Sequence, residues 1–203
     1  MVVLAATGLE WRAVRRAVAG SGVPVVRCGV GLRRWDAPQT PGERGPALIT
    51  CGLAGGLRAD LPPGIVVIAD SVAYEDGERL TCDPAWVTKL VAGARACGQE
   101  PVVGPMLTAR RLVVGEARRA WAEKGFVAAE METALLAAAG APLGSLRVVL
   151  DAPSREVSAE WSRPAARVAL DPRRWAETVW LATRAPRYAR LAARCLAEAL
   201  SAA

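Results

Sequence analysis

The sequence predicts an α/β protein in which a mostly parallel or mixed sheet lies between helices. Apolar strands alternate with helix-forming segments along most of the 203 residues. Several strands, such as Ile65–Ala69 and Phe126–Ala129, are apolar at consecutive positions, which is typical of strands covered on both faces. Polar or glycine-rich segments follow four of the strands. The length suits one domain, residues 1–203, with a substantial core.

The first part of the chain is expected to hold one helix among short buried strands. Residues Glu10–Val18 have helical periodicity, with Val14 and Val18 on one face and arginines on the other. Asp36–Gly45 is rich in Pro and Gly and predicts a loop. An Asp-Gly pair in Glu75–Glu78 predicts a hairpin turn between the strands Val72–Tyr74 and Arg79–Thr81. The apolar runs predict strands at Val2–Ala6, Val23–Cys28, Pro46–Thr50, Ile65–Ala69, Val72–Tyr74 and Arg79–Thr81.

The second part of the chain combines capped helices with further strands. Asp83-Pro84 pairs an N-cap residue with a proline at the first helical position, so a helix is expected from there to about Cys97. Asp171-Pro172 starts another helix in the same way, and Pro186 is expected to start a last helix that runs to about Ala202. The remaining predicted elements are the strand Pro101–Leu107, the helix Gly115–Lys124, the strand Phe126–Ala129, the helix Thr133–Ala139 and the strand Leu146–Leu150.

Composition excludes several classes of protein. No uncharged apolar run reaches the roughly 18 residues of a membrane span, so we expect no stable membrane insertion. The N-terminus has no basic segment before its apolar run, as a secretory signal would, and the five scattered cysteines form no C-x-x-C pair. A cytoplasmic protein with reduced thiols is therefore predicted.

The charged residues also narrow the range of functions. The chain has no histidine, so the commonest metal ligand and acid–base group is missing, and we expect no metal and no organic cofactor. The net charge of +6 comes almost entirely from arginines that are spread along helices, without a basic block interleaved with aromatic residues. We therefore expect no nucleic-acid partner, whereas a mildly basic surface suits an anionic small ligand.

The segment Phe126–Ala139 is the most informative stretch. Glu130, Met131 and Glu132 come directly after the apolar residues Phe126–Ala129. In open α/β sheets, ligands bind outside the carboxyl ends of strands. Burying unpaired carboxylates costs several kcal/mol, so two glutamates between a buried strand and an apolar helix indicate a binding role. The alternative is an exposed elbow with solvated glutamates.

Three other segments follow strands and are expected to converge with this one on a pocket. Gly8–Arg12 opens a helix, where Glu10 is either a site residue or a carboxylate favoured by the helix dipole. The glycines of Gly52–Gly56 allow the backbone to approach a ligand closely, or form a tight structural turn. Asp151 ends the apolar run Leu146–Leu150 and is a candidate acid or base, or an Asp that caps a turn.

Taken together, these segments resemble the purine nucleoside phosphorylase and nucleosidase superfamily. The resemblance rests on Cys51–Leu57 (CGLAGGL), then Leu61–Val67 (LPPGIVV), and later Ala129–Ala134 (AEMETA), and it covers Val2 to about Pro153. Within it, the chain looks most like short members associated with hopanoid biosynthesis, which share GLAGGL, a segment like Cys82–Pro84 and one like Thr183–Arg187. The resemblance implies a three-layer phosphorylase/hydrolase-like fold and cleavage of a nucleoside's N-glycosidic bond.

The resemblance also implies roles for particular residues. The second glutamate of the EME segment, Glu132, would accept hydrogen bonds from the ribose hydroxyls beside Met131, with Glu130 in the same segment. Asp151 would donate a proton toward purine N7, which requires a raised pKa. Residues at the base would be Leu112 and Val113, which lack the phenylalanine frequent in the family, and Leu53, Ala54 and Gly55 would line the sugar.

The first loop departs from the nucleosidase pattern. Nucleosidases carry a glutamate four residues after the first-loop Gly or Ala to position water, but here that place is held by Arg12. Gly8 with Arg12 reproduces the spacing with which the phosphorylases bind phosphate. Glu10 is nearby and would activate water instead if the first turn differs from that of the nucleosidases. Hydrolysis and phosphorolysis, with phosphate as a co-substrate, therefore both stay open.

The sequence thus predicts an enzyme that releases adenine from a 5′-modified adenosine, with adenosylhopane as a candidate. The alternatives are a nucleosidase for methylthioadenosine, adenosylhomocysteine or futalosine, and a non-catalytic nucleoside-binding protein on the same scaffold. Trp161, Trp175 and Trp180 would shelter a lipid-like 5′ group or simply pack helices together. Members of the family assemble, so a homodimer is expected.

Overall fold

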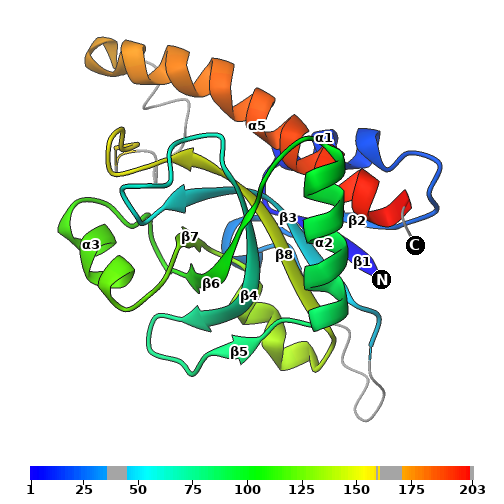
Figure 1. The fold of residues 1–203 in the computed structure, drawn as a ribbon. Helices are drawn as coiled ribbons and strands as arrows, with labels where there is room; N and C mark the ends of the chain where they lie inside the picture. The colour runs from blue at the N-terminus through cyan, green and yellow to red at the C-terminus, as the bar shows by residue number, and fades with distance from the viewer. Residues whose placement is uncertain (36–44, 159, 161–170, 202–203) are drawn as a thin grey trace.

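The chain forms an α/β structure in which helices flank a mixed sheet (Figure 1). The computed structural model describes residues 1–35, 45–158, 160 and 171–201. The predicted fold class, a mixed and mostly parallel sheet with flanking helices, is confirmed. Most of the predicted loop Asp36–Gly45 and the predicted site residue Trp161 lie outside the described residues.

Eight strands form one sheet in the described part of the chain, in the order β2-β1-β3-β7-β6-β4-β5, with β8 paired to both β3 and β4. The pairs β1/β2, β1/β3, β3/β8, β4/β6 and β6/β7 are parallel, and β3/β7, β4/β5 and β4/β8 are antiparallel. Because β8 pairs with both β3 and β4, the strands β3, β7, β6, β4 and β8 form a closed ring. The sequence does not predict this closure. The strands are β1 (Val2–Ala5), β2 (Val25–Arg27), β3 (Leu48–Gly56), β4 (Val66–Tyr74), β5 (Leu80–Thr81), β6 (Val102–Thr108), β7 (Ala128–Glu130) and β8 (Leu143–Asp151).

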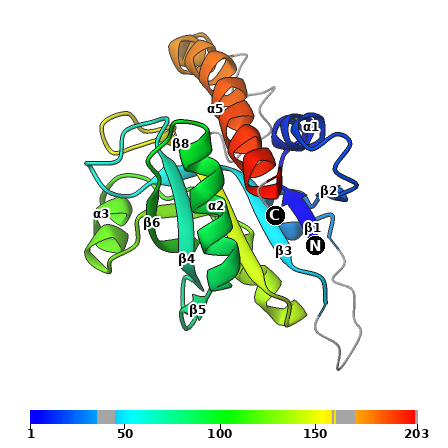
Figure 2. The same ribbon diagram turned by 45° about the vertical axis from the view of Figure 1, so that its right-hand side comes forward.

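Three α-helices, α1, α2 and α5, gather on one side of the sheet, and α3 lies on the other side of the molecule (Figures 1 and 2). Helix α5 packs against both α1 and α2, and the N-terminal part of α5 extends beyond the sheet. The α-helices are α1 (Gly8–Ala17), α2 (Pro84–Ala96), α3 (Glu116–Glu123) and α5 (Trp175–Ser201); the 3-10 helices are η1 (Val30–Leu32), η2 (Thr133–Ala139) and η4 (Pro172–Arg174).

Side-chain caps start two of these helices, and the one at Asp83 is predicted from the sequence. Asp83 caps α2 by accepting hydrogen bonds from the backbone N–H groups of Ala85 and Trp86. Thr7 caps α1, and the Glu10 side chain bonds back to the Thr7 backbone, which completes a capping box. The cap at Thr7 therefore also fixes the direction of the Glu10 carboxylate, a point that matters for the site below.

Three predictions about local structure are wrong. The glycine-rich segment Gly52–Gly56 is no loop but the second half of β3, because the glycines pair with β8 along the strand. Thr133–Ala139 forms a 3-10 helix rather than an α-helix. Pro186 does not start a helix but lies inside α5. Its cost of about 3 kcal/mol is offset by the buried face of residues Tyr188–Ala199, which packs into the core.

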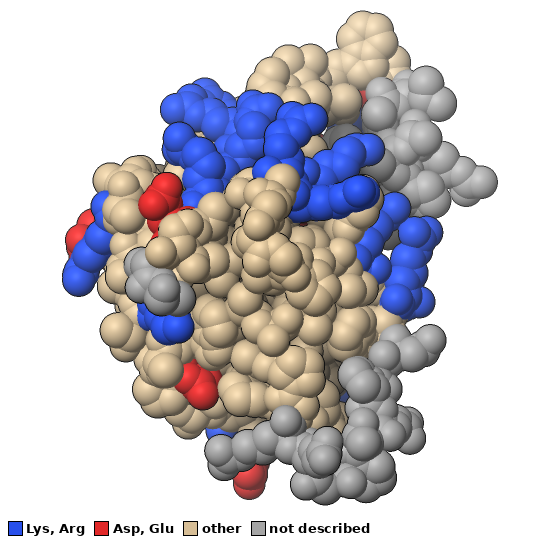
Figure 3. Space-filling view, turned by 90° about the vertical axis from the view of Figure 1, so that its right-hand side faces the viewer, with Lys and Arg blue, Asp and Glu red and all other residues tan. Residues whose placement is uncertain are grey.

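The surface has an uneven distribution of charge. Lys and Arg side chains gather in the upper part of the face shown in Figure 3, on the side of the molecule that carries α1 and the C-terminal end of α5. No helix in the described segments is both long and apolar enough to cross a membrane.

The contact between α2 and α5 depends on one glycine. A Cβ atom added to Gly93 would lie 2.4 Å from the backbone oxygen of Cys195 and 2.5 Å from the backbone nitrogen of Ala199. We predict that Gly93→Ala lowers the free energy of unfolding by about 1–3 kcal/mol, the usual cost of overpacking. Urea denaturation measures this. An increase in stability, as expected from helix propensity alone, would show that the two helices are not in close contact.

Candidate active site

A pocket of about 210 Å³ lies where β1, β3, β7 and β8 end and α1 begins. It brings together most of the residues that the sequence singles out, from segments far apart in the chain. The predicted site residues that line it are Glu10, Leu53, Ala54, Gly55, Leu112, Glu130, Met131, Glu132 and Asp151. The convergence of the four segments that the sequence predicts is therefore found in the structure.

Arg147 of β8 is the cation of this pocket, and it is 2% exposed. Its Nη2 lies 2.5 Å from Oε2 of Glu130 and 3.3 Å from Oε2 of Glu132. Its Nη1 donates to the backbone oxygen of Leu53 at 3.4 Å. A buried arginine needs such partners because an unpaired charge would cost several kcal/mol. The pairing explains how two glutamates can lie at the end of a buried strand.

Glu130 is held almost entirely by protein groups. Oε1 accepts a hydrogen bond from Thr108, and Oε2 accepts from the Thr133 hydroxyl at 2.8 Å and from the backbone N–H of Glu132 at 3.0 Å. With Arg147 added, the acceptor positions of this carboxylate are largely filled. Glu130 therefore positions the segment that follows it more than it offers a free group to a ligand.

Glu132 has fewer protein partners than Glu130. Its Oε1 accepts a hydrogen bond from the backbone N–H of Gly31 at 3.1 Å, and its Oε2 faces Arg147. Burial raises the pKa of the Glu132 carboxyl to about 7; Arg147 opposes this shift, while the negative charges of Glu130 and Glu10 add to it. A carboxylate with open acceptor positions and a raised pKa is suited to bind hydroxyl groups that stabilise its charged form.

Glu10 reaches the pocket from the first turn of α1. Its Oε2 accepts from the backbone and hydroxyl of Thr7 at 2.8 and 2.7 Å, and its Oε1 accepts from the backbone N–H of Leu53 at 2.7 Å. The side chain is 3% exposed. A carboxylate oxygen accepts about two hydrogen bonds, so Thr7 fills Oε2, whereas Oε1 accepts one from Leu53 and can accept another. Glu10 therefore keeps the capacity to hold a water molecule through Oε1.

The glycines of β3 provide space for these carboxylates. A Cβ at Gly52 would lie 2.2 Å from Oε1 of Glu10, and one at Gly55 would lie 3.2 Å from Oδ1 of Asp151. A side chain at Gly52 would displace the Glu10 carboxylate, and one at Gly55 would be in tight contact with Asp151. The glycine-rich segment therefore serves the site as a strand whose bare backbone lies directly against two acidic groups.

Asp151 is paired with a buried arginine that the sequence analysis does not identify. Its Oδ2 forms an ion pair with Arg118 of α3 and accepts from the backbone N–H of Val157 at 2.9 Å. Burial raises the pKa of the Asp151 carboxyl, and Arg118 acts in the opposite direction with a smaller effect. The raised pKa that the sequence predicts is thus found, but with an opposing charge in contact. Oδ1 faces Gly55 and accepts no hydrogen bond from the described residues.

Three predicted site residues do not line this pocket. Gly8 starts α1, and its Cα faces the guanidinium of Arg27. Arg12 lines a separate groove between α1 and α5. Val113 packs in an apolar cluster with Leu57 and other residues, while its neighbour Leu112 lines the pocket. The spacing of Gly8 and Arg12 therefore does not bring the arginine to the carboxylates.

The most important residues that sequence reasoning missed are the two buried arginines. Arg147 interrupts the apolar run Leu146–Leu150, and a charged residue inside a buried strand indicates a buried partner. Thr7 and Glu10 form a T-x-x-E pattern, the signature of a capping box, which could have been recognised. Arg118 has no comparable sequence feature, because it lies among the exposed charges of α3.

The described segments hold no group of three or more His, Cys, Asp or Glu side chains that could bind a metal ion.

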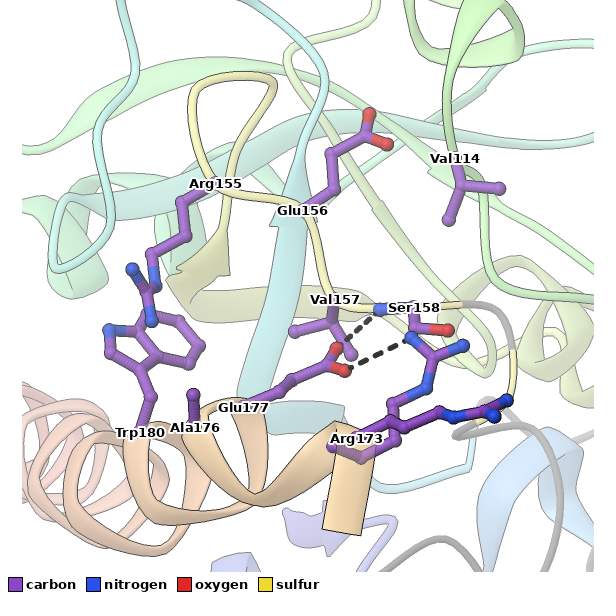
Figure 4. A pocket seen from close by; sticks show the side chains of 10 residues that line it. Val114, Arg155, Glu156, Val157, Ser158, Arg173, Ala176, Glu177 and Trp180 are labelled. Atoms are coloured by element: carbon purple, nitrogen blue, oxygen red, sulfur yellow. Dashed lines mark hydrogen bonds and ion pairs between the residues drawn. The ribbon is translucent and has the colours of Figure 1, made fainter. Parts of the chain in front are cut away.

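A larger cavity of about 530 Å³ adjoins the pocket through Val157, which lines both (Figure 4). The guanidinium of Arg155 lies over the ring of Trp180, 4.9 Å from its centroid. Glu177 accepts a hydrogen bond from the backbone N–H of Ser158 at 2.5 Å and pairs with Arg174 at 3.6 Å. The lining of the cavity thus includes one aromatic ring, which the Arg155 guanidinium covers, and several charged groups.

Comparison with known proteins shows the family of the chain. The phosphorylase superfamily matches residues 5–179, so the chain belongs to this superfamily. The membership agrees with the predicted enzyme class, a nucleoside phosphorylase or nucleosidase. No curated protein sequence matches the chain. The finer resemblance to the hopanoid-associated members stays a prediction, as do the homodimer and the cytoplasmic location.

Solved structures share the fold at low sequence identity. A putative 5′-methylthioadenosine/S-adenosylhomocysteine nucleosidase from Borrelia burgdorferi, bound to adenine, is 12% identical with a TM-score of 0.77 and coverage of 100% of this chain and 99% of that chain. The nucleosidase of the same name from Neisseria meningitidis is 18% identical, with a TM-score of 0.71 and coverage of 100% and 98%. A futalosine hydrolase from Helicobacter pylori is 14% identical, with a TM-score of 0.73 and coverage of 99% and 97%.

The raised pKa of Glu132 predicts how stability depends on pH. The ordinary value is 4.5 and the value in the folded chain is about 7, so between these values the folded chain holds a proton that the unfolded chain releases. The resulting stabilisation is complete below pH 4.5 and is lost as the pH rises through 7. Relative to Glu132→Gln, the wild-type chain should therefore lose about 2–3 kcal/mol of stability between pH 5 and pH 8.

Urea denaturation at a series of pH values measures this difference. Glu123→Gln, which changes an exposed glutamate of α3, is the matched control and should follow the wild type. Parallel curves for the wild type and Glu132→Gln would show that Glu132 has an ordinary pKa in the folded chain.

Proposed function

We propose that the chain cleaves the N-glycosidic bond of a purine nucleoside by hydrolysis and releases adenine from a 5′-modified adenosine. One observation carries the proposal: Glu10, Glu132 and Asp151 come from distant parts of the chain and line the same pocket. Family membership supports the reaction class. The roles below follow from the chemistry of the side chains and their positions.

The EME segment would bind the ribose. Glu132 would accept hydrogen bonds from the two vicinal hydroxyls, and Met131, which also lines the pocket, would contact the sugar. The bond between C1′ and N9 breaks with its electron pair going to the purine, which leaves positive charge on the sugar. The carboxylates of Glu132 and Glu10, which line the same pocket, would stabilise that charge.

Asp151 would act on the base. Its Oδ1 is the carboxyl oxygen that accepts no hydrogen bond from the described residues, and burial raises its pKa toward the value that a general acid needs. In this role Asp151 donates a proton to N7 as the purine departs, and Arg118 then stabilises the carboxylate that remains. Leu112 would pack against the base.

Glu10 would position the attacking water and take up its proton. The pocket contains Glu10, whereas Arg12, the candidate for phosphate, lines a different groove. Glu10 and Glu132 keep open acceptor positions, while the charge of Arg147 is paired with Glu130 and Glu132, and this disfavours a phosphate ion in the pocket. These positions support water over phosphate as the nucleophile.

The 5′ substituent would extend into the cavity beyond Val157. That cavity is larger than the reaction pocket and has the Trp180 ring in its wall. The cavity offers space for a 5′ group, but charged and polar residues make up more than half of its lining, so it does not select an apolar group. Adenosylhopane remains a candidate substrate on the resemblance. Methylthioadenosine, adenosylhomocysteine and futalosine remain alternative substrates of the same reaction.

A non-catalytic nucleoside-binding protein is the second candidate function. The contact between Asp151 and Arg118 favours the ionised carboxylate, and an ionised carboxylate cannot donate a proton. If this contact dominates in the bound state, the pocket would bind a nucleoside without cleaving it.

The nucleophile is tested by adenine release from a panel of 5′-substituted adenosines, each with and without phosphate. We expect release from at least one substrate at a rate that phosphate does not change. Release that requires phosphate would contradict the role given to Glu10. Binding of the nucleosides without any release would establish the second candidate function instead.

The role of Asp151 is tested by Asp151→Asn, which keeps the shape of the side chain but removes the acid. Loss of a general acid costs a factor of about 100 to 10,000 in rate, so kcat should fall by at least 100-fold while nucleoside binding is retained. Asp60→Asn, at a surface carboxylate paired with Arg58, is the control and should leave kcat unchanged. Unchanged kcat in Asp151→Asn would remove the acid from the mechanism.

A further inference from the structure

A groove of about 340 Å³ runs between α1 and α5 on the outside of the molecule. Four arginines line it: Arg12 and Arg16 from α1, and Arg190 and Arg194 from α5. The rest of its lining is mostly small and apolar: Leu9, Ala13, Ala17, Pro186 and Ala193. We propose that this groove binds a soluble anion that carries two or more phosphoryl groups.

None of the four arginines forms an ion pair with a described residue, so four positive charges line one groove without a bonded carboxylate. Figure 3 shows basic side chains gathered on this side of the molecule. Like charges brought together in this way repel one another, and a bound polyanion relieves that repulsion.

The chemistry of the groove matches phosphate better than other anions. All four cations are arginines, whose planar guanidinium groups bind phosphate oxygens in pairs. Four such groups can engage several phosphoryl groups at once. The volume also falls in the range of small-molecule sites, and its concave form suits a soluble ligand better than a flat membrane surface.

The groove is distinct from the reaction pocket. Arg12 and Arg16 are exposed on α1, while Glu10 of the same helix is buried and bonded to Leu53 of β3. A ligand in the groove therefore contacts the opposite face of α1 and does not touch the nucleoside. The proposal does not depend on the catalytic roles proposed above.

The test is calorimetric titration of the full chain with tripolyphosphate at physiological ionic strength. We expect saturable binding that Arg12→Gln combined with Arg190→Gln weakens at least tenfold. The matched control, Arg119→Gln with Lys124→Gln, removes the same charge from α3 and its C-cap residue. Helix α3 lies on the other side of the molecule (Figures 1 and 2), so this control should change the affinity less than twofold. Circular dichroism verifies that both variants are folded.

Two further measurements distinguish a soluble polyphosphate from inorganic phosphate and from lipid headgroups. Inorganic phosphate should bind more weakly than tripolyphosphate, because it engages fewer arginines. Vesicles of phosphatidylcholine with phosphatidylglycerol should not compete with tripolyphosphate. The proposal is overturned by the absence of saturable binding, by equal losses in the two double variants, or by vesicle binding without tripolyphosphate binding.

Discussion

The guanidinium group of Arg147 lies between Glu130 and Glu132, and the arrangement of the pocket depends on this contact. Without the arginine, two carboxylates would be buried side by side at the end of β7, and protonation or displacement would follow. With it, Glu130 is fixed by neighbouring hydroxyl and backbone groups, and Glu132 keeps open positions for a ligand. With Arg147 in place, Glu130 has a structural role and Glu132 is available for binding.

The second constraint is the close approach of acidic side chains to bare backbone. Glu10 lies against Gly52 and Asp151 lies against Gly55, so β3 can be a regular strand and still leave space for both carboxyl groups. Both faces of α1 line a cavity: Glu10 faces the reaction pocket, and Arg12 and Arg16 face the groove beside α5. One short helix therefore contributes to the reaction pocket and to the arginine-lined groove.

Much of the fold and most of the pocket follow from the sequence, because buried strands and N-capped helices are local patterns. The EME segment and Asp151 stand out because each places an acid directly after an apolar run, and Glu10 stands out because it lies in the first turn of a helix that follows a strand. Contacts between distant segments do not appear in local patterns, which is why the partners Arg147 and Arg118 and the closure of the sheet by β8 were missed. The helix across Pro186 was missed for a related reason: its stability comes from the buried face that follows the proline.

A crystal structure of the chain with a C-nucleoside analogue of adenosine, whose C–C glycosidic bond cannot be cleaved, tests the central claim most directly. The account predicts that the ribose hydroxyls lie within hydrogen-bond distance of Glu132, with N7 of the base beside Asp151 and a water molecule or open space next to Glu10. An analogue bound elsewhere, or one whose sugar contacts neither Glu132 nor Met131, would contradict the assignment of this pocket as the site of nucleoside cleavage.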